Sequence, residues 1–580
     1  MDVGSVNERS ARQLIHQCVM QGVEIFCIAP GSRCTPLVLA AEANPRAQTI
    51  VHYDERGLAF FALGLAKSSG KPVAIISTSG TAVANLMPAV MEASLDRVPL
   101  LLLTADRPAE LRDCGANQTC DQVKLFQTYV RWQVDLPCSD EQIPTRYFAT
   151  TVAQAARSAT HLNPGPVHLN CMFREPLFPK DSAPFVEATP VQWEKCTPTL
   201  DSDTLDIWAE RLQETSHGLI LVGSLPPGTD TTPILQLAEK LDWPIFPDIL
   251  SQVRTLGKHT HVIAHFDELL KAGHQQEVSA ILHFGNRLVS KTLAEWLRTK
   301  TPTFYFQITD HEQRQDPDHM VTHRLNISPA HFAGLIAKRI PQSSSDAILF
   351  WQAGEALVDE HLEQLFAGQH LLTEPGLVHA LATHHKRPCA YFFASSMPIR
   401  DTNLFFALET TCGPLFGNRG VSGIDGNIAT IAGIAHGVQM PLIAIVGDQT
   451  LLHDLNSLPL LLQTPSPVLL IVVNNAGGGI FNFMPIASIA PEVCETHFCN
   501  EHSLTFRSAA ELFALPYAQP QNCNKLNELL DNFFLQRKSQ VIEVQTERHA
   551  NVLFHQQISA ELKQCLTSLT ASKETTVSPK

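Results

Sequence analysis

The sequence has 580 residues, which is too long for one hydrophobic core, so we expect three or four domains. Charged residues make up 17% of the chain, below the share of about 25% in an average globular protein, which indicates a large buried fraction. The net charge of −15 argues against nucleic acid as a partner, and the apolar runs are too short for an integral membrane protein. The 14 cysteines show no CxxC or metal-ligand spacing, so we expect reduced thiols and a cytoplasmic location.

The first part of the chain alternates short apolar runs with helical stretches, which predicts α/β structure with parallel sheets. Residues 1–22 read as a capped amphipathic helix and not as a signal peptide. Two further helices are predicted at 56–70 and 80–96. Strands are predicted within residues 23–31, 71–80, 98–108 and 166–173.

A linker is predicted at 178–203, and a second α/β block follows it. Its strands are expected within residues 218–228, 243–249, 280–286 and 303–309. The serine-rich stretch 341–347 is a candidate hinge to a third block. Strands of the third block are expected within residues 389–397, 413–420, 441–449, 466–475 and 540–546. The first and third blocks are similar in length and rhythm, which makes a duplicated α/β unit plausible, and the polar tail at 566–580 is predicted to be disordered.

Two of the predicted strands end in residues that suit a magnesium site. One ends in Gly447-Asp448 and the next in Asn474-Asn475, with 475 − 448 = 27 positions from the aspartate to the second asparagine. Residues 450–467 are predicted as a crossover helix and a turn, so the two strand ends should lie side by side. Carboxylate, amide and backbone oxygens are ligands that Mg²⁺ prefers, and a glycine run at 477–479 lets a bulky anion approach the backbone. The alternative is ordinary turn chemistry, in which Asp448 is only a helix N-cap.

This order of Gly-Asp, crossover and Asn-Asn resembles the diphosphate–Mg²⁺ signature of thiamine-diphosphate enzymes. The signature most often reads Gly-Asp-Gly, and here Gln449 replaces the last glycine. The resemblance implies that thiamine diphosphate is bound through Mg²⁺, with Mn²⁺ as a possible substitute. It also implies that Asp448 and Asn475 supply side-chain oxygens to the metal and that Gly477 supplies a carbonyl.

A glutamate is the second element that thiamine chemistry needs, because it must hydrogen-bond the aminopyrimidine that removes the proton from the thiazolium. Glu55 stands between a strand and an apolar helix, and a dry setting there would raise the pKa of its carboxyl group. Its alternative interpretation is a solvated charge cluster with Asp54 and Arg56. The surrounding sequence resembles the pyrimidine-binding domain of the same enzymes, which favours the catalytic role.

The resemblance implies three parallel-sheet domains: a pyrimidine-binding domain at 1–185, a Rossmann-like middle domain at 200–342 and a diphosphate- and Mg-binding domain at 350–555. The middle domain lacks a full GxGxxG motif, so a second nucleotide is not expected. In this superfamily the two cofactor-binding domains of one site come from different subunits. The chain is therefore expected to form a homo-oligomer that is at least a dimer and commonly a tetramer.

Four sequence motifs narrow the resemblance to one group of thiamine-diphosphate enzymes. They are APGSRCTPL at 29–37, DERG at 54–57, TADRPAELRDCGANQ at 104–118 and GNRGVSGIDG at 417–426. Together they are similar to the synthases of menaquinone biosynthesis that make 2-succinyl-5-enolpyruvyl-6-hydroxy-3-cyclohexene-1-carboxylate. Such transferases decarboxylate 2-oxoglutarate and add the succinyl carbanion equivalent to isochorismate in a 1,4-addition. Both substrates are dicarboxylates, which arginine binds well because its guanidinium can grip a carboxylate with two hydrogen bonds.

The resemblance implies a substrate pocket made of nine residues: Ser32, Arg33, Arg107, Asn117, Gln118, Lys291, Ser396, Arg400 and Arg419. Six residues are assigned catalytic roles: Glu55, Ser32, Arg33, Gln118, Ser396 and Arg400. Three apolar residues would contact the cofactor: Ile424 would hold it in its bent form, and Ile480 and Phe481 would exclude water from the reacting carbon. Close relatives often have Lys-Arg where this chain has Lys291-Thr292, and Arg287 is a candidate to compensate.

Two other functions remain open from the sequence. A different thiamine carboligase or 2-oxoacid decarboxylase would keep Glu55, Asp448 and Asn475 but would use another acceptor. A catalytically silent relative would serve as a binding or scaffold protein, although such proteins usually lose Glu55 or Asp448.

Overall fold

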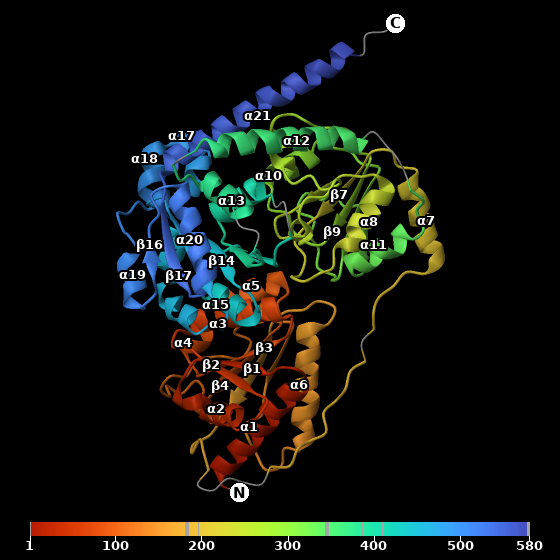
Figure 1. The fold of residues 1–580 in the computed structure, drawn as a ribbon. Coiled ribbons are helices and arrows are strands. Elements are labelled where there is room, and N and C mark those ends of the chain that lie inside the picture. The colour runs from red at the N-terminus through yellow and green to blue at the C-terminus, as the bar shows by residue number, and fades with distance from the viewer. Residues whose placement is uncertain are drawn as a thin grey trace. The chain divides into compact units, whose positions relative to one another are not determined.

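The structure is a computed structural model that describes residues 2–179, 185–194, 196–342, 347–369, 371–384, 387–407 and 411–576. In these residues the chain forms three sheets one after another, and each described strand pairing is parallel (Figure 1). The α/β fold class with three parallel sheets is thereby confirmed. The sheets lie within the ranges predicted for the three domains, while the domain boundaries stay predictions.

The first sheet has the strand order β2-β1-β3-β4-β6-β5. Its strands are β1 (Ile25–Ile28), β2 (Gln48–Val51), β3 (Val73–Ser77), β4 (Leu100–Asp106), β5 (Trp132–Asp135) and β6 (Val167–Met172). The helices of this part are α1 (Val3–Met20), α2 (Thr35–Glu42), α3 (Glu55–Ser69), α4 (Thr81–Ala84), α5 (Met87–Asp96) and α6 (Thr145–Thr160). The central strands β3 and β4 are buried along their whole length, as parallel strands covered on both faces should be.

The middle sheet has the order β11-β10-β9-β7-β8. Its strands are β7 (Gly218–Val222), β8 (Ile245–Pro247), β9 (Ala280–Phe284), β10 (Phe304–Thr309) and β11 (His323–Asn326). The helices of this part are α7 (Ser202–Gln213), α8 (Thr232–Leu241), α9 (Phe266–Lys271), α10 (Lys291–Leu297) and α11 (Pro329–Ala337).

The third sheet has the order β13-β12-β14-β15-β17-β16, which is the order of the first sheet with its strands numbered from β12. Its strands are β12 (Ala390–Phe393), β13 (Leu415–Phe416), β14 (Leu442–Gly447), β15 (Val468–Asn474), β16 (Tyr517–Ala518) and β17 (Gln540–Gln545). The α-helices after the middle domain are α12 (Ala347–Ala367), α13 (Glu374–Thr383), α14 (Met397–Phe405), α15 (Asn427–Gly437), α16 (Asp448–His453), α17 (Ile486–Ile489), α18 (Pro491–Val493), α19 (Arg507–Leu512), α20 (Cys523–Gln536) and α21 (Arg548–Thr576). The shared strand order supports the duplicated unit that the rhythm of the two blocks suggested.

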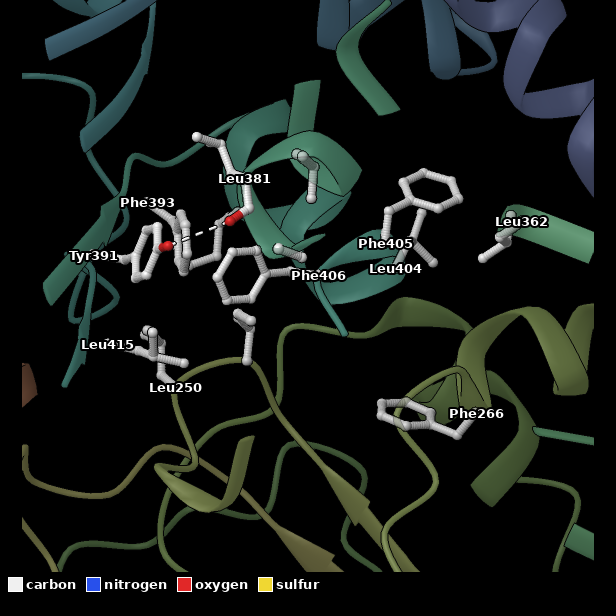
Figure 2. Packing of buried hydrophobic residues seen from close by; sticks show 14 of the residues in the cluster. Leu250, Phe266, Leu362, Leu381, Tyr391, Phe393, Leu404, Phe405, Phe406 and Leu415 are labelled. Carbon is white, nitrogen blue, oxygen red and sulfur yellow. Dashed lines mark hydrogen bonds between the residues drawn. The ribbon is translucent and has the colours of Figure 1, made fainter. Parts of the chain in front are cut away.

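A large apolar core joins this sheet to the loops and helices that come before it in the chain. Figure 2 shows part of the core, where aromatic side chains from β12 and the end of α14 pack with Leu250 and Leu415. The hydroxyl of Tyr391 donates a hydrogen bond to the carbonyl of Leu381 at 3.3 Å, so its polar group is satisfied inside the core (Figure 2).

The described residues cluster in two compact units that each combine several chain segments. One unit contains Met1–Cys196, Asn418–Gln439 and Thr450–Val468, and the other contains Thr197–Gly417, Met440–Gln449 and Leu469–Lys580. In the first unit α15 packs closely against α3 because both helices carry glycine at the contact. A Cβ on Gly64 would lie 2.1 Å from the carbonyl oxygen of Thr430, and one on Gly433 would lie 2.0 Å from that of Phe61.

Part of the segment predicted as a linker lies in extended form along α1. Residues 180–184 and 195 lie outside the described residues, but 185–194 run beside the first helix. The side chains of Gln17 on α1 and of Gln21, the residue that caps its C-terminus, donate to the carbonyls of Ala188 and Val191 at 2.7 and 2.8 Å. Because i and i+4 lie on one face of a helix, these side chains hold an extended segment in register.

Two predicted elements differ from the structure. The helix expected at 80–96 is divided into α4 and α5, with Pro88 in the first turn of α5. The crossover expected as one helix is α16 followed by a 3₁₀ helix, η5 (Leu455–Leu462), which contains Pro459.

Helix α21 is described up to Thr576, and the buried side chains Ile558, Leu562 and Leu566 form one apolar stripe along it, while the prediction of a disordered tail at 566–580 stays a prediction. The last four residues lie outside the described residues, as do residues 343–346 of the candidate hinge. Among the described residues, no helix combines the length and the apolarity needed to cross a membrane.

Candidate functional site

Asp448 is held at the carboxyl end of β14, where its side chain is only 2% exposed. Its Oδ1 accepts the backbone N–H of Gln449 at 2.5 Å, and its Oδ2 accepts that of Gly477 at 2.8 Å. The second hydrogen bond links the ends of β14 and β15, so the two strand ends lie side by side as expected. Burial raises the pKa of the Asp448 carboxyl group, and the two backbone donors oppose that shift.

The two asparagines at the end of β15 have different surroundings. The amide of Asn474 donates to Glu543 at 2.8 Å, and its Oδ1 accepts the N–H of Ala476 at 3.1 Å. The amide of Asn475 donates to Glu374 at 2.9 Å, but its buried Oδ1 has no hydrogen-bond partner among the described residues. Asn474 therefore closes the turn, and Asn475 presents an unused oxygen.

The glycine run after Asn475 can carry no side chains without rearrangement. Gly477 has φ of 150°, and a Cβ there would lie 2.6 Å from the carbonyl oxygen of Cys499. A Cβ on Gly479 would lie 2.6 Å from the Asn475 amide nitrogen. The carbonyl of Gly477 accepts the N–H of Gly479 at 2.9 Å, which leaves one of its two lone pairs for another ligand. The loop thus brings backbone close to Asp448 and Asn475.

These residues fit a small hard cation. Such a cation needs oxygen ligands, and the orphaned Asn475 Oδ1 is a buried acceptor whose desolvation nothing described compensates. Asp448 supplies the single carboxylate that is usual where phosphate oxygens complete the coordination of Mg²⁺. Ile480 and Phe481, both half-buried, begin the 3₁₀ helix η6 (Gly479–Phe483) directly after the loop.

Four further residues support this site and were not predicted. Glu374 and Glu543 hold the asparagine amides, and Arg548 donates to the carbonyls of Asn475 and Ala476 at 3.3 and 3.2 Å. His502 places its Nε2 3.3 Å from Asp448 Oδ2. In the sequence, Glu374 follows Thr373 at an ordinary helix start, so the local pattern gives no sign of its distant partner.

Burial raises the pKa of Glu374 to about 7, and the nearby Asp401 adds to that shift. The imidazole of His555, 3.2 Å from Asp401 Oδ1, partly offsets this concentration of acidic groups.

Glu55 is the first residue of α3, in the unit that holds the first sheet. Its neighbours are occupied elsewhere: Asp54 caps the helix through the N–H groups of Arg56 and Gly57, and Arg56 donates to the carbonyl of His453 at 2.8 Å. Within the described part of the chain, Glu55 accepts one long hydrogen bond, from Asn85 at 3.3 Å, and is half-buried. The alternative of a self-paired charge cluster therefore does not describe Glu55, while its catalytic role stays a prediction.

The carboxyl edge of the first sheet gathers several of the predicted pocket residues. Arg33, in the 3₁₀ turn Ser32–Cys34, and Arg107, after β4, are both buried, and the positive charge of Arg33 contributes to a lowered Arg107 pKa, behind the main effect of burial. Arg33 donates to Glu175 at 2.8 Å, and Arg107 donates to the carbonyl of Gln118 at 2.9 Å. The side chains of Ser32, Asn117 and Gln118 are exposed.

The loop that carries Arg419 and Ile424 is anchored in the same unit. The N–H groups of Gly420 and Val421 donate to the buried carboxylate of Glu92 at 2.8 and 2.7 Å. Gly426, at φ 64°, lies against the ring of Phe60, where a Cβ would be 1.9 Å from a ring carbon. Arg419 and Ile424 are half-buried between these two anchors.

The remaining pocket residues lie in the other unit. Ser396, with φ of 79°, precedes α14, and the guanidinium of Arg400 donates to the Ser396 carbonyl. Lys291 begins α10, has a side chain that is 88% exposed and pairs with Glu295 at 3.4 Å. Arg287 is exposed and Thr292 is half-buried. The structure thus joins Ser396 with Arg400, whereas Lys291 faces solvent in this chain.

Comparisons with known proteins bear on this arrangement. Residues 9–125 match a family model described as the N-terminal thiamine pyrophosphate binding domain of thiamine pyrophosphate enzymes, and residues 181–392 match its middle domain. A 2-succinyl-5-enolpyruvyl-6-hydroxy-3-cyclohexene-1-carboxylate synthase of Rubrobacter xylanophilus is 39% identical, over 95% of this chain and 98% of that protein. The chain belongs to this synthase family.

Two other relatives are similar to nearly the whole chain. A synthase of the same name from Salinibacter ruber is also 39% identical, over 95% of this chain and 96% of its own length. The chloroplastic protein PHYLLO of Arabidopsis thaliana is 34% identical over 96% of this chain, which corresponds to 35% of that longer protein. The resemblance to the synthase family is therefore confirmed along nearly the whole chain.

Proposed function

We propose that this member of the synthase family decarboxylates 2-oxoglutarate with thiamine diphosphate and Mg²⁺ bound and adds the remaining succinyl unit to isochorismate. The product of this 1,4-addition would be 2-succinyl-5-enolpyruvyl-6-hydroxy-3-cyclohexene-1-carboxylate, in menaquinone biosynthesis. The observation that carries the proposal is 39% identity, over 95% of the chain, to a synthase named for this product. The oxygen-lined end of β14 and β15 supports it independently.

Thiamine diphosphate, when bound, supplies a nucleophilic carbon and an electron sink for the decarboxylation of a 2-oxoacid. Asp448, Asn475 and the Gly477 carbonyl would hold the metal that carries its diphosphate. The carboxyl group of Glu55 would hold a proton against the pyrimidine ring. Ile480, Phe481 and Ile424 would wall the reacting carbon and keep water from it.

The proposed substrate pocket is dominated by basic groups because both substrates are dicarboxylates. Guanidinium groups bind carboxylates with paired hydrogen bonds, and buried ones do so with little competition from water. Arg33 and Arg107 are buried at one sheet edge, which supports their assignment to carboxylate binding. The other proposed pocket residues are Ser32, Asn117, Gln118, Lys291, Ser396, Arg400 and Arg419.

The proposal includes a homo-oligomer, at least a dimer and in the superfamily commonly a tetramer, in which the two halves of a cofactor site come from different copies. The proposal also includes a cytoplasmic location. Mn²⁺ is a possible substitute for Mg²⁺, since both are hard cations that accept oxygen ligands.

The decisive experiment gives purified protein 2-oxoglutarate, thiamine diphosphate and Mg²⁺, with and without isochorismate. We expect the adduct by mass spectrometry only when isochorismate is present, together with carbon dioxide. Carbon dioxide release that ignores isochorismate, without adduct, would instead identify another decarboxylase or carboligase. No calorimetric binding of the cofactor at high micromolar concentration would point to a catalytically silent protein.

A further inference from the structure

The orientation of the Asn475 amide decides whether the end of β15 can bind a cation. An amide group offers an oxygen on one side and an N–H₂ group on the other, and only the oxygen can serve a metal. Asn475 is a buried side chain, so its orientation is fixed by its neighbours and not by solvent. The neighbour that contacts its nitrogen is Glu374, at 2.9 Å.

We propose that Glu374 is a positioning residue that holds the Asn475 amide by its nitrogen and so turns Oδ1 toward the cation. This inference rests on the metal site of the proposed function. Glu374 is suited to the task because its Oε1 accepts from both Asn475 and Thr546, so an Asn475 turned the other way would set two acceptor oxygens against each other. Glu374 is 4% exposed, which leaves no water to relieve that conflict.

Glu374 is itself fixed by a second donor. The hydroxyl of Thr546 donates to the same Oε1 at 3.0 Å, from the residue that follows β17. Glu374 is at the start of α13, and its preceding residue Thr373 caps that helix through the N–H of Gly376 at 3.1 Å. Two donors thus contact Oε1, and Asn475 is held by a residue 101 positions earlier in the chain.

Glu543 provides an internal comparison. It is also a buried carboxylate that accepts from an asparagine amide, at 2.8 Å, but its partner Asn474 uses its own Oδ1 to close the turn. Asn475 makes no such turn contact, and its Oδ1 is left unpartnered in the described residues. The same carboxylate–amide hydrogen bond therefore supports a turn at Asn474 and leaves the Oδ1 of Asn475 available as a ligand.

The test measures metal binding directly in the full-length protein. With thiamine diphosphate present, Mn²⁺ binding is followed by electron paramagnetic resonance for wild type, Glu374→Leu, Glu374→Gln and Thr546→Val. We expect Glu374→Leu to weaken Mn²⁺ binding by about 10- to 100-fold, the usual effect of removing a partner of a metal ligand. Glu374→Gln should restore binding to within about threefold, because its amide oxygen can still accept from Asn475.

Thr546→Val removes the second donor to Glu374 but leaves the bond to Asn475, so it should weaken Mn²⁺ binding less than Glu374→Leu does. In Mg²⁺ titrations of turnover, Glu374→Leu should raise the activation constant while turnover at saturating metal stays within a fewfold of wild type. Equal Mn²⁺ affinity in folded Glu374→Leu and wild type would overturn the positioning role. Wild type that binds no metal with the cofactor would instead overturn the proposed function.

Discussion

In the charged sequence Asp54-Glu55-Arg56 at the start of α3, local contacts occupy the two outer side chains and leave Glu55 available. Asp54 is used as a cap and Arg56 is used on the carbonyl of His453, so Glu55 is the member left for another partner. Its half-buried position gives it access to a ligand without full exposure to water. Since Glu55 does not hold the local structure, we expect its substitution to lower turnover while leaving cofactor binding largely unchanged.

Replacement of Glu55 by glutamine keeps the shape and removes the ionisable proton. We expect cofactor binding by calorimetry to change little and turnover to fall by at least about 100-fold, the scale of general acid–base catalysis. Glu42→Gln, an exposed carboxylate at the end of α2, should have wild-type turnover. A Glu55→Gln enzyme with near-normal turnover would remove Glu55 from the mechanism.

Asp454 is a buried acid whose charge should make stability depend on pH. Burial raises its pKa from an ordinary value of 3.8 to about 6, although it accepts hydrogen bonds from Ala429 and Ser457. The folded protein thus binds the proton more tightly than the unfolded chain, and this group's contribution to stability falls as the pH rises from about 4 to about 6.

An asparagine at this position cannot ionise, so Asp454→Asn should gain stability relative to wild type by about 1 kcal/mol between pH 5 and pH 7. Urea-unfolding midpoints of the two proteins at both pH values measure this difference. A gap between the two proteins that is the same at pH 5 and pH 7 would mean that Asp454 has an ordinary pKa in the folded state.

At the scale of single residues, the sequence could predict which residues would bind the metal, but not which residues hold them in place by hydrogen bonds. Gly447-Asp448 and Asn474-Asn475 stand at strand ends, where parallel topology alone brings them together. Glu374 and Arg548 reach the same loop from distant elements, and the sequence around them shows only a helix start and a charged residue. Long-range hydrogen bonds of this kind have no local pattern from which to predict them.

Among the elements, the pair α3 and α15 depends on glycine for its close approach. Each helix meets the backbone of the other where it has no side chain, at Gly64 and Gly433. Since Glu55 begins α3 and the loop with Ile424 leads into α15, this contact also sets two predicted site residues in one unit.

We expect Gly433→Ala to destabilise the protein by about 2 kcal/mol or more, because its Cβ would lie 2.0 Å from a backbone carbonyl that cannot turn aside. Gly334→Ala in α11 is the control: its nearest neighbour would be Pro233 at 3.7 Å, and helix propensity should add up to about 1 kcal/mol. Thermal unfolding measures both. A Gly433→Ala protein as stable as wild type would show that the two helices can separate at no cost.

The strands that the sequence did not predict have one property in common. They are β5, β11 and β16, and each stands at an edge of its sheet. Their burial is partial, so they lack the continuous apolar run that marks a central parallel strand. The interior strands could be predicted because they form largely apolar runs in the sequence.

At the scale of the whole molecule, one surface segment is unusually apolar. Between η6 and α19 the chain exposes a series of large apolar side chains, and Ile489 is 78% exposed. The others in this segment are Phe483, Met484, Val493, Phe498, Leu504 and Leu512. Exposed apolar side chains mark an interaction surface where they form one patch, and we propose that this segment contacts a second copy in the homo-oligomer.

Ile489→Asp should shift the protein toward monomer in analytical ultracentrifugation, because a charge buried in an apolar interface loses its hydration. Ile207→Asp, on an exposed apolar position of α7 outside this segment, should leave the distribution of species unchanged. If Ile489→Asp has no effect on sedimentation while the wild type is oligomeric, subunits associate through another surface.

The assembly of one compact unit from three separated stretches limits how the chain can be dissected. A fragment that ends at residue 196 would keep the first sheet and α3 but would lack α15 and η5, which belong to the same unit. The faces of α3 that hold Phe61 and Gly64 would then meet water, and such a fragment should aggregate on expression instead of folding alone. A chimera of this protein with a relative would therefore have to exchange all three stretches of the unit together.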